Sequence, residues 1–320
     1  MGGLGVFVHH RFSARRAALA VSSLLAGALL LSACGAGPSS SGAGSTSPDG
    51  KISVVASTDV YGSIAGAIGG SKVNVTSIIN GPSQDPHSYQ ATAQDKLAVS
   101  KAQLGIENGG GYDDFFDQLA GGGTLSADRM VNVVDLSGLM TEANKADFNE
   151  HVWYSLPTMA TLADTLADRL AALDPAGAAT FKANASFFKT SISGISGRLD
   201  AVKAGHAGEP VAITEPVPLY LLQSAGLENR TPEAYSHAIE EGSDVPAGVL
   251  KQTTDLVGAR GVRFLAYNDQ TEGPQTEAVR KAAEAAGVPV VNFTETLPDG
   301  LDYLGWMSQN AANIQQALAK

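Results

Sequence analysis

Apolar residues recur along this chain at two spacings, and the two spacings alternate. Short apolar runs bounded by glycine, proline or polar residues are typical of buried strands, whereas apolar residues three or four positions apart predict helices. The expected strands are residues 52–57, 73–79, 104–107, 131–134, 211–214, 262–267 and 288–293. Helical patterns lie between them, and such alternation favours parallel sheets covered on both faces. The pattern therefore predicts an α/β fold, and its restart after residue 208 predicts a second α/β lobe.

The most regular apolar pattern lies at residues 175–205. Its apolar positions, three or four residues apart, are Ala178, Phe181, Ala185, Phe188, Ile192, Ile195, Leu199 and Val202. A helix of this length would reach on the order of 40 Å at ~1.5 Å per residue, long enough to span two lobes. A coiled coil is the alternative, but the repeat is short and globular sequence lies on both sides of it. We therefore expect an interlobe helix.

The first 33 residues depart from this globular pattern. A basic segment with three arginines between residues 11 and 16 precedes an apolar stretch at residues 17–31, and a small-residue cleavage site follows. This arrangement is typical of a secretory signal peptide. A short membrane anchor is the alternative, but the apolar stretch is short for a membrane span and leads into a tract rich in glycine, serine and proline rather than into charges.

Cys34 is the only cysteine, and it stands at the position that bacterial lipoproteins acylate. Leu31-Ser32-Ala33-Cys34 resembles their lipobox. We therefore expect lipidation at Cys34 and a protein that is anchored to the outer face of the cell membrane or is periplasmic. With this thiol used as an anchor, none remains for a disulfide or a thiolate metal site.

These patterns divide the chain into five parts. At 320 residues the chain is long enough for two apolar cores. The expected parts are a lipoprotein signal peptide at residues 1–33, a flexible lipid-anchored tether at 34–50, an N-terminal α/β lobe at 51–174, the interlobe helix at 175–205 and a C-terminal α/β lobe at 206–320.

The net charge argues against some partners. The chain carries 32 acidic residues against 21 Lys and Arg, a formal net charge of −11. This balance disfavours binding to nucleic acid, and it disfavours binding to anionic lipid through charge alone. An acidic surface is compatible with attracting cations.

A stiff loop with a histidine at its tip follows the second expected strand. Pro82 and Pro86 restrict the backbone before His87. After His87, Thr92 and Asp95 form a capping-box pattern that predicts the start of a helix. Neutral imidazole is the commonest metal ligand, and open α/β folds bind ligands at the carboxyl ends of their strands. The alternative is an ordinary surface histidine.

Three segments carry the candidate ligands in a recognisable context. The first is Asp85-Pro86-His87-Ser88-Tyr89, with Gly-Ile-Glu-Asn-Gly at residues 105–109 on the next strand. The second is Asn149-Glu150-His151-Val152-Trp153-Tyr154, which precedes a helix with proline in its first turn. The third is Glu215-Pro216-Val217-Pro218-Leu219-Tyr220. Together these segments resemble the zinc/manganese solute-binding lipoproteins that feed ABC importers, a TroA-like family that has histidine or a carboxylate at the position of Glu215. The resemblance extends from about residue 52 to the C-terminus.

The resemblance implies two parallel-sheet α/β lobes joined by a long interlobe helix, with a metal site between the lobes. It implies His87, His151 and Glu215 as metal ligands. A capping or core-edge role for His151, and a helix N-terminal charge for Glu215, are the alternatives without the resemblance.

The fourth ligand stays open. The resemblance indicates an acid in the loop after the strand expected at residues 262–267. Within that loop we favour Glu272, with Asp269, nearer the strand end, as the alternative. Water in the fourth position and Asp59, at the end of the first strand, are further alternatives.

The resemblance also implies a function. A protein of this family captures Zn²⁺ or Mn²⁺ as a transported ligand outside the cytoplasm and delivers it to the permease of an ABC importer. We therefore expect a monomer that is not an enzyme, with the permease and, through Cys34, the membrane as partners. Histidine and carboxylate ligands suit zinc, manganese and iron alike, so the ligand set leaves the physiological metal open.

Two other classes of function compete with this interpretation. The sequence has no His-Glu-x-x-His, no Gly-x-Ser-x-Gly and no Walker loop. A site of two histidines and a carboxylate with an open position could still activate water, so a metal-dependent hydrolase is one alternative. A hydrolase should leave a substrate cleft beside the ion, whereas a binding protein should bury the ion between its lobes. A surface lipoprotein with a role in cell adhesion is the other alternative.

Overall fold

The computed structural model describes residues 50–82, 84, 86–121 and 124–320. The predicted signal peptide, the lipidation site at Cys34 and nearly all of the predicted tether lie outside these residues. No helix within the described ranges combines the length and the apolar character needed to cross a membrane.

The first lobe is built on a four-stranded parallel sheet with the strand order β2-β1-β3-β4. The strands are β1 (Ile52–Thr58), β2 (Val73–Ile79), β3 (Leu104–Glu107) and β4 (Met130–Asn132). The connecting helices are α1 (Asp59–Gly69), α2 (Ala93–Lys101), α3 (Asp114–Ala120) and α4 (Val133–Ser137). Alternate residues of β1 enter different cores: Val54 packs in the core with α1, and Val55 packs in the core with α2 and α3. The sheet is thus covered on both faces, as its continuous apolar runs predict.

The second lobe repeats this plan, with the strand order β6-β5-β7-β8. The strands are β5 (Pro210–Ile213), β6 (Glu228–Asn229), β7 (Leu265–Asn268) and β8 (Val290–Phe293). The helices are α7 (Leu219–Ser224), α8 (Glu233–Glu240), α9 (Ala247–Gly258), α10 (Pro274–Ala286) and α11 (Tyr303–Leu318). On β5, Ala212 enters the core beneath α9 and α10, while Val211 and Ile213 enter the core that includes α11.

Several strand bounds differ from the sequence-based expectations. β7 begins at Leu265 rather than at residue 262, and β8 begins at Val290 rather than at residue 288. The fourth strand ends at Asn132 rather than at residue 134, because the Asn132 side chain accepts the backbone N–H of Asp135 at 3.0 Å and caps α4. The following apolar residues, Val133 and Val134, are therefore helical and buried. Strand β6 was not predicted, since its two residues are too few to show any alternation.

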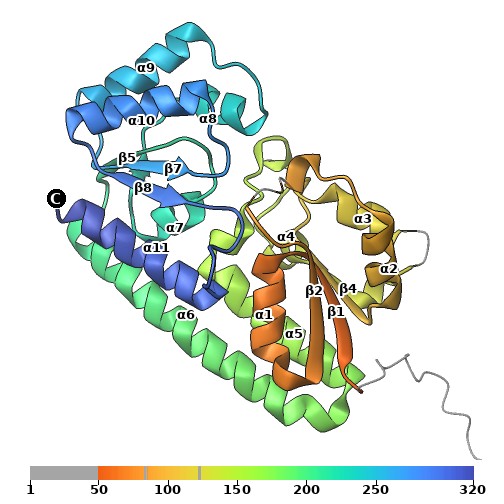
Figure 1. Ribbon diagram of the computed structural model, residues 1–320. Helices are drawn as coiled ribbons and strands as arrows, with labels where there is room; N and C mark the ends of the chain where they lie inside the picture. Colours follow the sequence, from red (N-terminus) through yellow and green to blue (C-terminus); the bar gives the residue numbers. More distant parts are fainter. Residues whose placement is uncertain (1–49, 83, 85, 122–123) are drawn as a thin grey trace, which may run out of the picture. The chain divides into compact units, whose positions relative to one another are not determined.

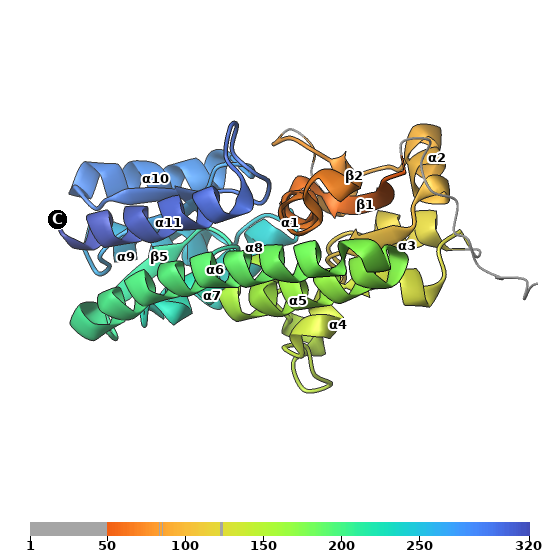
Figure 2. The same ribbon diagram turned by 90° about the horizontal axis from the view of Figure 1, so that it is seen from below.

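The long helix α6 (Ala178–His206) packs against both lobes. It contacts α1 and α5 (Leu156–Leu173) of the first lobe, and α7 and α11 of the second (Figure 1, Figure 2). The predicted apolar stripe is confirmed from Phe181 to Val202, where every expected position is buried. One continuous core joins strand residues of both sheets to this stripe. The prediction of two parallel-sheet α/β lobes with a long interlobe helix is confirmed.

Candidate metal centre

His87 is presented by a short 3-10 turn, Pro86–Ser88, between β2 and α2. The helix that follows is anchored by the predicted capping box: Thr92 Oγ1 accepts the Asp95 N–H at 3.2 Å, and Asp95 Oδ2 accepts the Thr92 N–H at 2.7 Å. The Tyr89 hydroxyl donates to the same carboxylate oxygen at 3.0 Å. The His87 ring meets the Tyr112 ring edge-on, with centroids 5.0 Å apart. The histidine therefore stands on a loop whose far end is held by hydrogen bonds.

Glu150 and His151 lie in a segment that is held in place by main-chain contacts. The Asn108 side chain, just beyond β3, donates to the Glu150 carbonyl at 2.9 Å. The Tyr303 hydroxyl of α11 donates to the Trp153 carbonyl at 2.7 Å. Trp153 itself is buried in the core. These contacts place the segment against the carboxyl edge of the first sheet and against the second lobe.

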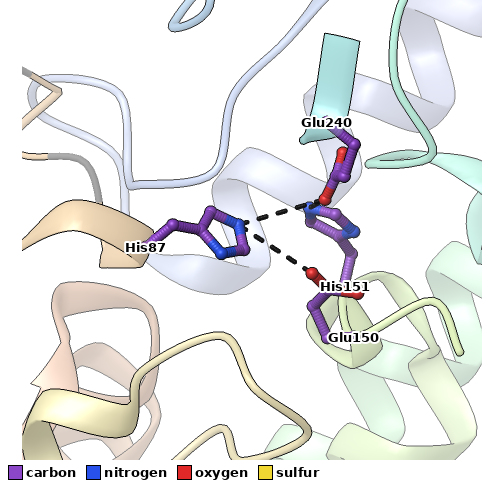
Figure 3. Close-up of side chains that lie close together, drawn as sticks. All are labelled: His87, Glu150, His151 and Glu240. Atoms are coloured by element: carbon purple, nitrogen blue, oxygen red, sulfur yellow. Dashed lines mark ion pairs between the residues drawn. The ribbon is translucent and has the colours of Figure 1, made fainter. Parts of the chain in front are cut away.

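Glu240 comes from the second lobe, where it is the last residue of α8. Figure 3 shows its carboxylate pointing toward the side chains of His87, Glu150 and His151. One ligand atom of each of these four residues lies within 4.8 Å of the others. We call His87, Glu150, His151 and Glu240 the four-residue cluster.

The distances within the four-residue cluster suit a small cation. Glu240 Oε1 is 3.5 Å from His151 Nε2 and 3.9 Å from His87 Nε2, and Glu150 Oε1 is 3.9 Å from His87 Nε2. Bonds of ~2.0–2.2 Å to tetrahedral zinc would place ligand atoms about 3.4 Å apart. The cluster would need only a small contraction to hold such an ion.

Burial shifts the pKa values of His151 and Glu240 and so favours the neutral form of both side chains when no cation is bound. The side chain of His151 is 1% exposed, and burial, with a smaller effect of the nearby His87, holds its pKa well below the ordinary histidine value. Burial also raises the pKa of Glu240, and the neighbouring carboxylates of Glu150, Glu215 and Glu295 raise it further. Without a cation, His151 is thus neutral, and Glu240 tends to keep its proton. A neutral buried imidazole is ready to act as a ligand.

A cavity of about 640 Å³ lies beside the cluster and is bounded by both lobes. Its wall includes Glu150 and Glu240 of the cluster. The other titratable residues in the wall are Asp147, Glu233, Glu241 and His237, and the residues that line the cavity include no Lys or Arg. A cation that enters through this cavity therefore passes carboxylates and no fixed positive charge.

Glu215 lies at the carboxyl end of β5, close to Glu240 but outside the four-residue cluster. Its buried carboxylate accepts hydrogen bonds from the side chains of Asn268 and Thr271. The Asn268 amide also donates to Glu295, beyond the end of β8, at 2.8 Å. Two carboxylates at strand ends are thus joined through one amide.

The other acids considered for the fourth position lie elsewhere. The Glu272 side chain is 45% exposed and pairs with Arg280 Nη1 at 2.5 Å. Asp269 is an exposed residue, although partial desolvation of its carboxyl group, with a smaller effect of the Glu272 charge, raises its pKa, and it interacts with the Asn292 side chain. Asp59 accepts the Leu297 N–H at 3.2 Å, and burial raises its pKa to about 6. The structure places none of these three in the four-residue cluster.

The sequence-based reasoning missed two members of the cluster, Glu150 and Glu240. A signal for Glu240 was present: it ends a helix and is followed by Glu241, although negative charge is unfavourable at a helix C-terminus. Acids placed against the helix dipole indicate a role other than helix stability. Glu150 stood beside His151 in the quoted segment, but nothing local distinguished it from a solvated acid.

Comparison with known proteins extends this description. Residues 54–317 match the family described as "Zinc-uptake complex component A periplasmic". The chain is 25% identical over 307 residues to the manganese ABC transporter substrate-binding lipoprotein scaA of Streptococcus gordonii, with 91% of this chain and 95% of that protein covered.

Solved structures share the fold. The solute-binding protein FpvC from Pseudomonas aeruginosa in complex with Mn²⁺ has a TM-score of 0.69 and 22% identity, over 84% of this chain and 98% of that chain. The periplasmic zinc binding protein TroA from Treponema pallidum has a TM-score of 0.66 and 22% identity, over 85% of this chain and all of that chain (100%). The family match spans most of the two lobes, and this chain therefore belongs to the family of zinc-uptake complex component A, periplasmic.

Proposed function

We propose that this chain is an extracytoplasmic solute-binding lipoprotein that captures a divalent transition metal, Zn²⁺ or Mn²⁺, between its two lobes and delivers it to an ABC import permease. The observation that carries the proposal is the four-residue cluster, in which three residues of the first lobe and one of the second bring ligand atoms within 4.8 Å. The family match and the lipoprotein relative support the same function.

The proposed ligands are two imidazoles and carboxylates from both lobes. His87 and His151 supply nitrogens, a donor set that suits zinc, manganese and iron. The Glu240 carboxylate of the second lobe lies 3.9 Å from His87 Nε2 and 3.5 Å from His151 Nε2. Glu215, which the resemblance implies as a ligand, is near enough for its charge to raise the pKa of Glu240, and it follows the end of β5, where open α/β sheets bind their ligands. Glu272 is left out of the proposed site, since it is paired with Arg280.

The competing functions receive less support. The family is one of binding components, which favours capture over catalysis. The cavity beside the cluster is bounded by both lobes and lined by acids, as a route for a cation requires. We therefore propose binding rather than hydrolysis, and we propose that the protein acts as a monomer.

The function is tested by metal analysis and by growth. Protein purified without added metal should take up zinc or manganese stoichiometrically when titrated, and a deletion strain should grow poorly when the physiological metal alone is limiting. Growth under separate zinc and manganese limitation identifies that metal. A chain that takes up neither ion, from a strain that shows neither defect, would be inconsistent with the proposal.

Metal affinity is expected to rise with pH through the neutral range. Because the pKa of Glu240 is raised, the metal-free protein keeps a proton that a cation must displace, so proton competition weakens binding below that pKa and fades above it. The pKa of His151 is lowered, so its own proton competes only at more acidic pH. Calorimetric titrations of zinc in buffers of different ionisation enthalpy should detect the proton release at neutral pH. Glu240→Gln should release fewer protons, and equal release by the two proteins would contradict this account.

Membrane attachment is proposed to depend on Cys34. Cys34→Ala should shift the protein from the membrane fraction to the soluble extracytoplasmic fraction or block its processing, because no thiol remains to be acylated. Fractionation of cells followed by mass spectrometry of the mature N-terminus measures both. An unmodified Cys34 thiol in the mature, membrane-extracted wild-type protein is the result that would refute the anchor.

A further inference from the structure

Asn149, two residues before His151, contacts that histidine with one end of its amide and the second lobe with the other. Asn149 Oδ1 lies 2.7 Å from His151 Nδ1 and also accepts the His151 backbone N–H at 3.2 Å. Asn149 Nδ2 donates to the Pro216 carbonyl at 3.0 Å. Pro216 directly follows Glu215. One side chain thus connects an imidazole of the metal centre to the segment that carries Glu215.

These contacts determine which way the amide points. A backbone N–H can only donate, so the amide atom that faces it must be the oxygen. The Pro216 carbonyl can only accept, so the amide atom that faces it must be the nitrogen. Two independent partners therefore agree on the orientation of Asn149.

The orientation of the amide then determines the tautomer of His151. Since Asn149 Oδ1 is an acceptor, Nδ1 of the imidazole must carry the hydrogen and donate it. Nε2 is left with its lone pair, 3.5 Å from Glu240 Oε1, and it has no hydrogen-bond partner among the described residues. Free histidine favours the opposite tautomer, with the hydrogen on Nε2, which cannot bind a cation through that atom.

The main chain of Asn149 is also tied to the second lobe. The Tyr220 hydroxyl of α7 donates to the Asn149 carbonyl at 2.7 Å. Tyr220 is partly buried beside Glu150, whose charge adds to the effect of burial in raising the tyrosine pKa to about 12, so it stays a donor at neutral pH. Asn149 thus makes two hydrogen bonds to the second lobe, one through its side-chain amide to Pro216 and one through its backbone carbonyl to Tyr220. Only the side-chain amide also orients His151.

We propose that Asn149 is a positioning residue, which holds His151 with its hydrogen on Nδ1 and its Nε2 lone pair toward the cation, and which links this imidazole to the Glu215 segment of the second lobe. The proposal rests on the proposed function of metal capture. Mutation of a residue that orients a ligand histidine in this way typically lowers metal affinity 10- to 100-fold.

The tautomer is tested without any metal. The imidazole nitrogen signals of metal-free, ¹⁵N-histidine-labelled protein at neutral pH should show a pyrrole-type Nδ1 and a pyridine-type Nε2 for His151, with His151→Gln identifying the signal. Asn149→Asp keeps an acceptor and should keep this pattern, whereas Asn149→Ala should lose it. Tyr220→Phe removes the bond to the carbonyl of Asn149 but leaves its amide, and it should keep the wild-type tautomer.

The affinity for zinc is then compared by competition with a chelator. Asn149→Ala should bind zinc about 10- to 100-fold more weakly than the wild type. A hydrogen on Nε2 in the wild type, or an unchanged Nδ1 hydrogen in folded Asn149→Ala, would overturn the proposal. Should Asn149→Ala not fold, the wild-type tautomer alone can overturn it. A wild type with the expected tautomer and no zinc affinity would instead refute the proposed function, so the two failures are distinguishable.

Discussion

Alanine in place of His87 or His151 is expected to lower zinc and manganese affinity by more than the ~10- to 100-fold that loss of an outer partner costs. Each imidazole supplies a nitrogen to the proposed site, and the four-residue cluster holds no third imidazole that could replace a lost one. His87→Ala is the more informative variant for folding, because the His87 side chain is 35% exposed and its removal leaves little empty space in the core.

The measurements are competition with a chelator and melting temperature with and without metal. A ligand at 100 times its Kd stabilises the native state by about 2.7 kcal/mol, so the wild type should melt at a higher temperature when loaded, whereas the variants should show little shift. His237→Ala is the matched control, since His237 lines the neighbouring cavity but is not in the cluster. If both ligand variants stay folded and bind both metals as tightly as the wild type, the site is wrong.

The same metal titrations distinguish the contributions of Glu240, Glu215 and Glu272 to metal affinity. Glu240→Gln and Glu215→Gln each keep the size of the side chain and one acceptor oxygen but cannot supply a carboxylate ligand, so the larger loss of affinity identifies the second-lobe ligand. Glu272→Gln should bind as the wild type does, because its partner is Arg280. Strong loss in Glu272→Gln with no loss in the other two would restore the original fourth-ligand prediction.

Phe188→Ala is expected to cost about 3–5 kcal/mol of unfolding free energy. Phe188 is 1% exposed in the stripe of α6, and its ring stacks on Tyr303 of α11, with centroids 5.9 Å apart and planes 24° apart. Truncation would leave a cavity where the interlobe helix meets the second lobe. Since single domains are usually stable by only ~5–15 kcal/mol, this is a large share of the total.

The adjacent Phe187 provides a control of identical chemistry. It is 72% exposed, so Phe187→Ala should change stability by no more than about 0.5 kcal/mol. Urea denaturation of the metal-free proteins, followed by circular dichroism and by tryptophan fluorescence, measures both variants. Equal shifts in the two midpoints would show that the face of α6 has been assigned incorrectly.

The elements were predictable where a pattern repeats. The apolar stripe of α6 recurs over about six helical turns, and each buried position from Phe181 to Val202 was expected. Boundaries were less predictable, because a side chain can end an element without changing the apolar pattern. Asn132 does so at the end of β4 by capping α4, although the next two residues are valines.

The candidate metal centre was predictable only in part. The resemblance of their segments to a known family singled out His87 and His151, and the structure places both in one cluster, with their Nε2 atoms near Glu240. The resemblance favoured Glu272 over Asp269 in the loop after that strand. The ion pair of Glu272 with Arg280 depends on where α10 packs, which the local sequence does not specify. Glu240 was not considered, because its helix end reaches the first-lobe histidines only when both lobes are folded onto α6.

The sequence by itself determined the α/β class, the two lobes, the interlobe helix and the two histidines. These follow from short-range periodicity and from motif segments of a few residues, which each part of the chain carries without reference to the rest. Tertiary structure alone decided which carboxylates meet those histidines and how the imidazole of His151 is oriented. Glu240 and the Asn149–Pro216 bond join residues of different lobes, and these distances are set by the packing of both lobes on α6. Glu150 meets His87 within the first lobe, because the fold of that lobe brings their two segments together.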